Sequence, residues 1–190
     1  CVMRILVIGA RGQVGWELTQ RAPLLGHEVL AWDVAELDIT DAAAVDRLVA
    51  DVTKRFGQLD ILVNDAAYNK SIPFTDLDGL TQEEWDKIMA VNLTGPFLCT
   101  QAAAPLMRDS GGGCIVNITS IAGRMAALAQ SPYVASKWAF EGLSEGLAQE
   151  LAPFGVRVVI IEPGVTKSAI FAKNIDAPNQ SGAYDAAYRR

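Results

Sequence analysis

Short runs of apolar residues alternate along the chain with longer segments in which apolar side chains recur every three or four positions. The short runs are rich in β-branched residues and predict buried strands at residues 4–8, 28–32, 61–63, 114–118 and 156–161. The longer segments predict helices at residues 13–21, 42–56, 83–107 and 134–151. Strands that alternate with helices form a parallel sheet covered on both faces, so we expect an α/β, doubly wound, three-layer α-β-α fold.

Local features refine this outline. Only four residues separate Asp33 from Asp38, whereas a parallel crossover takes about a dozen residues, so any strand in between must be short or displaced. Gly95 and Pro96 lie inside the third helical segment, where proline removes a hydrogen bond, and a kink is expected near Asn92. The sequence contains no repeat, linker or low-complexity tract. Residues 1–190 are therefore predicted to form a single domain.

The composition favours a small-molecule partner. The 190 residues are 51% apolar and 20% charged, with a net charge of -6 that repels phosphate backbones and argues against nucleic acid. No apolar run approaches the roughly 20 residues of a membrane helix, and no membrane association is expected. The three cysteines show no CxxC spacing and the single histidine has no ligand-type neighbours, so we expect a reducing, cytoplasmic location and no metal site.

A glycine-rich turn follows the first predicted strand directly. It reads Gly9-Ala10-Arg11-Gly12-Gln13-Val14-Gly15 and opens the first helix. Glycines bring backbone N–H groups against a pyrophosphate, which then lies at the positive end of the helix, as in the Rossmann fold. Residues Gly9, Arg11, Gly12, Gln13, Val14 and Gly15 are therefore candidate cofactor-binding residues. A simple turn between strand and helix is the alternative interpretation.

Acidic residues after the second strand are placed to bind an adenosine moiety. Asp33 can accept hydrogen bonds from both ribose hydroxyls and repels a 2′-phosphate, which favours NAD, whereas Arg11 can pair with the 2′-phosphate of NADP. We expect NAD or NADP, with a slight preference for NAD. Asp38 and Ile39 are candidates for the adenine edge, and Thr40 or Asp41 suits an N-cap for the second helix.

A tyrosine and a lysine lie one helical turn apart in the stretch Ser131 to Lys137. Pro132 suits a first helical position and Ser131 an N-cap, so Tyr133 and Lys137 share a face. A phenol reacts slowly at neutral pH unless a nearby positive charge stabilises its phenolate, and Lys137 supplies such a charge. Ser120 lies just after a predicted strand, thirteen residues upstream of Tyr133. Without Ser120, a surface pair on a helix would be the default interpretation.

These motifs resemble the short-chain dehydrogenase/reductase family. Residues 56–172 resemble its acyl-carrier-protein-reductase-like branch through LVNDAA, VNLTGPF, IVNITSIAG, SPYVASKWAFEGL and IEPGVTKSAIF. The resemblance implies hydride transfer between a nicotinamide and a carbonyl or alcohol carbon. It also implies that Tyr133 is the acid/base, that Lys137 binds the nicotinamide ribose and lowers the tyrosine pKa, and that Ser120 orients the substrate oxygen. Asn92 matches an asparagine whose backbone supports a proton-relay water.

The resemblance assigns further cofactor contacts. The family's Asn-Asn-Ala-Gly run reads Asn64-Asp65-Ala66-Ala67 here, and Asn64, Ala66 and Ala67 match residues that line the cofactor. Pro163 and Gly164 match the turn that contacts the nicotinamide amide, with Val165 and Thr166 beside it.

The sequence departs from that branch at both ends. Residues 3–48, with GARGQVGWEL, GHEVLAWD and AELDITDAAAV, resemble dTDP-4-dehydrorhamnose reductase, so the chain reads as a hybrid of two branches. After residue 177 we expect the family's last strand to be lacking.

A homodimer is expected, because the helices at 83–107 and 134–151 are apolar on more than one face and match the family's dimer seam. An NAD(P)-dependent oxidoreductase is the leading interpretation. The alternative is a dinucleotide-binding protein without efficient turnover.

Overall fold

A computed structural model of the chain describes residues 2–70, 77–126 and 129–164. One sheet contains β1 (Arg4–Ile8), β2 (Glu28–Trp32), β3 (Ile61–Asn64), β4 (Gly113–Ile118) and β5 (Val156–Ile161). All neighbouring strands are parallel, in the order β2-β1-β3-β4-β5. The predicted parallel sheet is confirmed. Residues 33–41 form no strand, and β2 leads directly into α2 (Ala42–Phe56).

The first two helices have their predicted bounds, since α1 covers Gln13–Arg21 and α2 covers Ala42–Phe56. Asp41 is the N-cap of α2, and its side chain accepts a hydrogen bond from the Ala43 N–H at 2.9 Å. At α5 (Ser131–Leu151) the predicted cap is wrong, because Ser131 is already helical and Gln130 stands at the cap position without a side-chain bond. Pro132 still suits the first turn, where its missing N–H costs no helical hydrogen bond.

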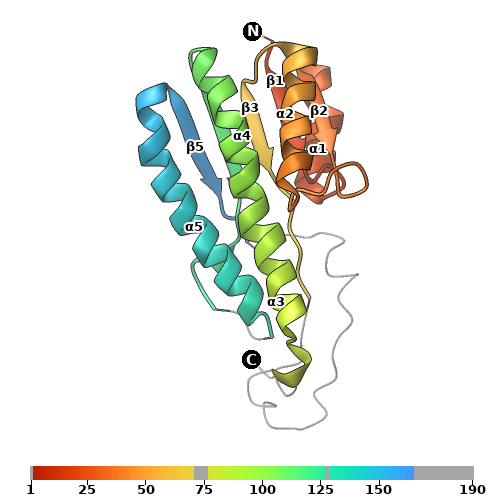
Figure 1. Ribbon diagram of the computed structural model, residues 1–190, viewed down its shortest axis with the longest axis vertical. Coiled ribbons are helices and arrows are strands. Elements are labelled where there is room, and N and C mark those ends of the chain that lie inside the picture. Colours follow the sequence, from red (N-terminus) through yellow and green to blue (C-terminus); the bar gives the residue numbers. More distant parts are fainter. Residues whose placement is uncertain (1, 71–76, 127–128, 165–190) are drawn as a thin grey trace.

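The predicted helix at residues 83–107 is in fact two helices joined by a π-helical turn. α3 covers Gln82–Met89, the π-turn covers Ala90–Thr94, and α4 covers Gly95–Asp109, so the two helices follow one another along one rod (Figure 1). The irregularity falls at the predicted place, since Asn92 is the middle residue of the π-turn. Such turns release backbone groups from the regular helical ladder and are frequent at functional sites.

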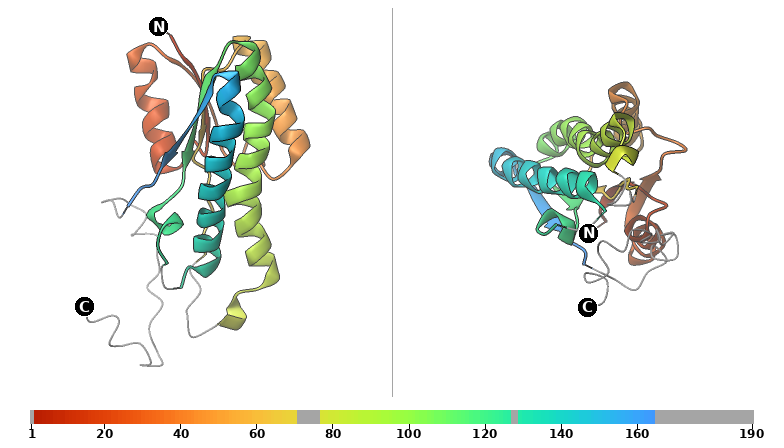
Figure 2. Two further views of the ribbon diagram at one scale, coloured as in Figure 1. Left: turned by 90° about the vertical axis from the view of Figure 1, so that its left-hand side faces the viewer. Right: turned by 90° about the horizontal axis from the view of Figure 1, so that it is seen from below.

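The helices form layers on both faces of the sheet (Figure 2). Alternate residues of β1 point to opposite faces: Leu6 and Ile8 pack in the cluster that α2 and α4 cover, whereas Ile5 and Val7 pack in the cluster on the α1 side. α5 lies beside α4 on the first face, while α1 lies on the other face (Figure 2). The predicted three-layer α-β-α architecture is therefore confirmed.

The connections between the strands place a crevice at the carboxyl ends of the strands. β2 lies on one side of β1 and β3 on the other, so the chain changes direction around β1. Ligands of doubly wound sheets bind at the carboxyl ends of the strands near this switch point. The expectation about the family's last strand concerns residues after 164, which lie outside the described residues. Within the described ranges, no helix has the length and apolar content that a membrane span requires.

Candidate active site

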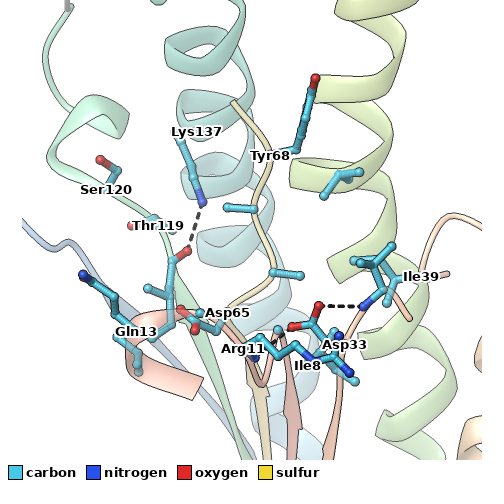
Figure 3. Close-up of a pocket in the computed structure, with 18 of the residues that line it drawn as sticks. Ile8, Arg11, Gln13, Asp33, Ile39, Asp65, Tyr68, Thr119, Ser120 and Lys137 are labelled. Atoms are coloured by element: carbon cyan, nitrogen blue, oxygen red, sulfur yellow. Dashed lines mark hydrogen bonds between the residues drawn. The ribbon is translucent and has the colours of Figure 1, made fainter. Parts of the chain in front are cut away.

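A cavity of about 770 Å³ opens at the carboxyl edge of the sheet. Every strand contributes its end or the residues that follow it, and α1, α3 and α5 add side chains (Figure 3). The strand-end residues that line the cavity are Ile8, Gly9, Trp32, Asp33, Asp65, Ala66, Ile118, Thr119, Ser120, Pro163 and Gly164. Residues that are far apart in the sequence thus meet at the switch point of the sheet.

The glycine turn forms one wall of the cavity. Gly9 has a φ of +93°, and a Cβ atom there would lie 2.5 Å from the backbone nitrogen of Ala66, so only glycine fits between the ends of β1 and β3. The turn is fixed by the Gly9 N–H, which donates to the Trp32 carbonyl at 2.9 Å. The predicted residues Arg11, Gly12, Gln13 and Val14 line the cavity, and Gly15 is buried beneath them.

The acidic end of the cavity contains an ion pair that the sequence did not predict. Asp33 Oδ2 accepts a hydrogen bond from the Arg11 N–H at 2.8 Å, and its Oδ1 accepts one from the Val34 N–H at 2.9 Å. The Arg11 guanidinium pairs with Glu36 at 2.7 Å. Asp33 and Arg11, for which the sequence predicts opposite effects on a 2′-phosphate, therefore lie together. The Arg11 guanidinium, however, is already paired with the Glu36 carboxylate.

Asp38 and Ile39 also line the cavity. Asp38 Oδ1 accepts hydrogen bonds from the Thr40 hydroxyl at 2.7 Å and the Thr40 N–H at 2.9 Å, and these bonds lower the pKa of Asp38. Ile39 is buried, and its side chain packs against the start of α4, where a Cβ on Gly95 would lie 2.5 Å from Ile39 Cδ1. The hydrogen bonds of Asp38 and the packing of Ile39 against α4 therefore fix the loop after β2.

Ser120, Tyr133 and Lys137 meet in the same cavity. Ser120 follows β4, and its Oγ accepts a hydrogen bond from the Ala122 N–H at 3.1 Å. Lys137 is only 1% exposed, and its Nζ donates to the carbonyl of Ile118 at 3.1 Å (Figure 3). The same Nζ lies 5.6 Å from the centroid of the Tyr133 ring.

Burial has the largest effect on the pKa values of both Lys137 and Tyr133. It lowers the pKa of Lys137 to about 8, against the opposing effect of the negative charges of Asp65 and Glu141. It raises the pKa of Tyr133, although the hydrogen bond with the Ser120 hydroxyl acts in the other direction. The net direction for the tyrosine is opposite to the lowering that the family resemblance implies, because the half-buried phenol loses solvation that its phenolate needs.

Asn92 lies behind the cavity wall and is fully buried. Its Nδ2 donates to the Tyr68 carbonyl at 2.8 Å and to the Ser136 hydroxyl at 3.0 Å, and its Oδ1 accepts from the Tyr68 N–H at 2.7 Å. The side chain therefore holds Tyr68, which lines the cavity, against α5. Asn92 is not itself among the lining residues.

Asn64 is likewise directed into the fold. It is 1% exposed, and its Nδ2 donates to Asn117 Oδ1 at 2.9 Å, which ties β3 to β4. The predicted residues Ala66, Ala67, Pro163 and Gly164 do line the cavity. Val165 and Thr166 lie outside the described residues.

The sequence did not predict several residues that line the cavity, among them Asp65, Tyr68 and Lys87. The Tyr68 hydroxyl donates to Glu84 at 3.1 Å, and Lys87 Nζ stands 4.3 Å from the centroid of the Tyr68 ring. Asp65 had a signal, since it replaces an asparagine of the family's run. In the described part of the chain, no three His, Cys, Asp or Glu residues are grouped so as to hold a metal ion.

A cluster of ion pairs connects three segments that carry residues of the site. Arg124 follows the short 3₁₀ helix after Ser120 and contacts Glu141 at 3.3 Å and Glu145 at 3.4 Å on α5, and Glu162 at 2.9 Å after β5. Glu141 is buried, and neither of its carboxylate oxygens has a hydrogen-bond partner in the described structure. Arg124 thus joins the three segments that carry Ser120, Lys137 and Pro163.

The parallel sheet, the glycine turn at its switch point and the strand-end crevice define a Rossmann-type α/β protein. The chain belongs to the short-chain dehydrogenase family, whose sequence pattern matches residues 17–179. It is 36% identical over 171 residues to an uncharacterized oxidoreductase of Mycobacterium bovis, covering 88% of this chain and 68% of that protein. It is 43% identical over 139 residues to an uncharacterized NAD-dependent oxidoreductase of Mycobacterium tuberculosis, covering 73% of this chain and 48% of the relative.

The solved structure of an NAD+-bound xylitol dehydrogenase shares the fold. Its TM-score with this chain is 0.82 at 28% identity, and the match covers 89% of this chain and 72% of that one. Together with the family, these relatives identify the chain as an enzyme of the oxidoreductase class.

Proposed function

We propose that the chain binds a nicotinamide dinucleotide in this cavity and transfers hydride between the nicotinamide and the carbon of a small carbonyl or alcohol substrate. One observation carries the proposal: the glycine turn, Asp33, Ser120, Tyr133 and Lys137 all line one cavity of about 770 Å³. A cavity of this size suits a cofactor together with a small substrate.

The residues present fit such a cofactor. Backbone N–H groups of the glycine turn and of the first turn of α1 would bind the pyrophosphate. The Asp33 carboxylate would accept from the adenosine ribose, and Asp38 and Ile39 would stand at the adenine edge. At the other end, Lys137 would bind the second ribose, and Pro163 and Gly164 the nicotinamide amide.

NAD is the cofactor that these residues favour over NADP. A 2′-phosphate would approach the Asp33 carboxylate, which repels it, while the Arg11 guanidinium that could compensate is paired with Glu36 at 2.7 Å. The names of two relatives support the same choice, because one is an NAD-dependent oxidoreductase and the other was solved with NAD+.

The bound nicotinamide supplies the hydride chemistry, and the side chains supply proton transfer and orientation. In reduction, the substrate oxygen accepts a hydrogen bond from Ser120 and takes the phenolic proton of Tyr133; oxidation reverses both steps. Lys137 provides the positive charge that offsets the phenolate left on Tyr133. Asn92 acts through the wall of the cavity, by holding the backbone of Tyr68 on both sides.

A homodimer is part of the proposal. α4 and α5 lie side by side on one face of the sheet (Figures 1 and 2). Each carries an exposed aromatic side chain, Phe97 at 37% and Trp138 at 54% exposure. Contiguous apolar surface marks candidate interfaces, and two neighbouring helices with exposed aromatic side chains are where we place this one. Light scattering at micromolar concentration should give twice the monomer mass, and a monomer mass would contradict this assembly.

The function is tested by titrating the protein with NADH and NADPH by fluorescence and then screening carbonyl compounds for dinucleotide oxidation. We expect binding of NADH and oxidation with at least one small ketone or aldehyde. Binding without turnover across the panel would favour the alternative, a dinucleotide-binding protein without efficient catalysis. Absence of binding would contradict both functions.

A further inference from the structure

Asp65 places a carboxyl group against the glycine turn. It is the first residue after β3, and its N–H donates to the Ile8 carbonyl at 2.9 Å, which fixes its position beside β1. Its Oδ2 accepts a hydrogen bond from the Gly15 N–H at 2.9 Å. The same oxygen lies 2.9 Å from the point that a Cβ on Gly12 would occupy. The carboxyl group therefore fills the space directly behind the turn.

This position is electrostatically unusual for a side chain with a negative charge. Gly15 is the third residue of α1, so its N–H is one of the donors at the positive end of that helix that have no partner within the helix. A dinucleotide brings two negatively charged phosphates to the same end. An ionised Asp65 both uses one of the donors and repels the ligand, whereas a protonated Asp65 does not repel it.

Few charged groups offset the carboxylate. The positive charge of Lys137 on α5 offsets it, whereas the negative charge of Asp33 at the end of β2 raises its pKa. Ile8 of β1 and Thr119 after β4, which also line the cavity, carry no charge. Figure 3 shows Asp65 in the same cavity as Gln13 and Lys137. Burial raises the pKa of Asp65 to about 6, although the Gly15 hydrogen bond and Lys137 lower it. The group can therefore change its charge near neutral pH.

We propose that Asp65 determines the affinity of the cavity for a dinucleotide through the charge of its own carboxyl group, so that binding is coupled to uptake of a proton by Asp65. The inference rests on the proposed function, because it assumes that the pyrophosphate lies on the glycine turn. Asparagine at this position would keep an oxygen that accepts the Gly15 N–H and would carry no charge. The substitution Asp65→Asn therefore removes the charge and leaves the hydrogen bond in place.

The test measures the dissociation constant of ADP-ribose by isothermal titration calorimetry between pH 5 and pH 7.5, at constant ionic strength. ADP-ribose contains the pyrophosphate but no nicotinamide. For the natural sequence we expect affinity to fall about tenfold from pH 5 to pH 7.5, the factor that corresponds to a shift of one pKa unit on binding. For Asp65→Asn we expect a dissociation constant that varies less than about twofold and is about tenfold lower than that of the natural sequence at pH 7.5. Asp46→Asn, on the exposed face of α2, should keep the natural pH dependence.

A second measurement does not depend on the folding of the variant. Calorimetry of the natural sequence at pH 6.5 in two buffers of different ionisation enthalpy gives the number of protons bound with the ligand. We expect an uptake of about half a proton per ADP-ribose. Binding with no proton uptake, or an Asp65→Asn variant that keeps the natural pH dependence, overturns the role of Asp65 and leaves the proposed function standing. Absence of ADP-ribose and NADH binding at every pH overturns both.

Discussion

The ammonium of Lys137 lies 5.6 Å from the centroid of the Tyr133 ring and at the same distance from the centroid of the Phe140 ring. Its Nζ donates to one backbone carbonyl, that of Ile118, at 3.1 Å. A cation that is 1% exposed thus sits between two aromatic rings and one peptide group. This buried position costs the ammonium solvation energy, and the cost has a measurable consequence.

Lys137→Met should abolish turnover without lowering stability at neutral pH. Because burial lowers the pKa of Lys137 to about 8, the charged form is disfavoured in the folded chain. The cost is fully present below pH 8 and disappears as the pH rises toward the ordinary lysine value of 10.5. We expect the variant to gain up to about 3 kcal/mol of unfolding free energy at pH 7 in urea titrations, and less at pH 9.5.

Lys54→Met, which replaces an exposed lysine of α2, is the matched control and should show no such pH-dependent gain. A marked loss of stability for Lys137→Met at pH 7 would show that contacts of the ammonium outweigh its burial.

Substitutions at the acidic end should change the preference between cofactors. Asp33→Ser removes the repulsion of a 2′-phosphate and the hydrogen bonds to the ribose. The NADPH dissociation constant divided by the NADH dissociation constant should therefore fall by at least about tenfold. Glu36→Gln should act in the same direction but more weakly, because it frees the Arg11 guanidinium that Glu36 binds at 2.7 Å. Fluorescence titration measures both ratios. An unchanged ratio in Asp33→Ser would remove Asp33 from the cofactor site.

The cluster around Arg124 predicts a coupling between two substitutions. Arg124→Ala leaves the buried Glu141 carboxylate without its cation, so the melting temperature should fall by a few degrees. Glu141→Gln in the same chain should recover part of this loss, since it removes the unpaired charge. Melting curves of the two single variants, the double variant and the natural sequence measure the coupling. Strictly additive effects would show that the two side chains do not depend on each other.

The regular elements followed from local pattern. The β-branched runs and the three-to-four spacing predicted β1, β2, β5, α1 and α2 with their observed bounds, since the apolar pattern of each element is local in the sequence. The π-turn at Asn92 was predicted only as a kink, because the proline at residue 96 indicates a break but not its geometry. The cap of α5 was missed because Pro132 suits several positions in a first turn. The origin of the chain from two branches of the family stays a prediction.

The site was predictable where a motif specifies backbone shape. The glycine turn and the tyrosine–lysine pair line the cavity, and their spacing in the sequence indicates the local turn and the shared helix face. The Arg11–Glu36 pair and the bonds of Asn92 to Tyr68 join residues 25 and 24 positions apart, which no local pattern reports. The upward direction of the Tyr133 pKa also depends on burial in the folded chain, which residue spacing does not contain.

The most direct test of the account is the comparison of Tyr133→Phe with the natural sequence in two measurements on the same samples: NADH binding by fluorescence and turnover with a carbonyl substrate from the panel. Phenylalanine keeps the ring beside Lys137 but lacks the proton. We expect the dissociation constant to change less than about twofold and turnover to fall by about 100-fold to 10,000-fold. Turnover that persists in the variant at the natural rate would contradict the role of the Tyr133 phenol as the acid and base of the reaction.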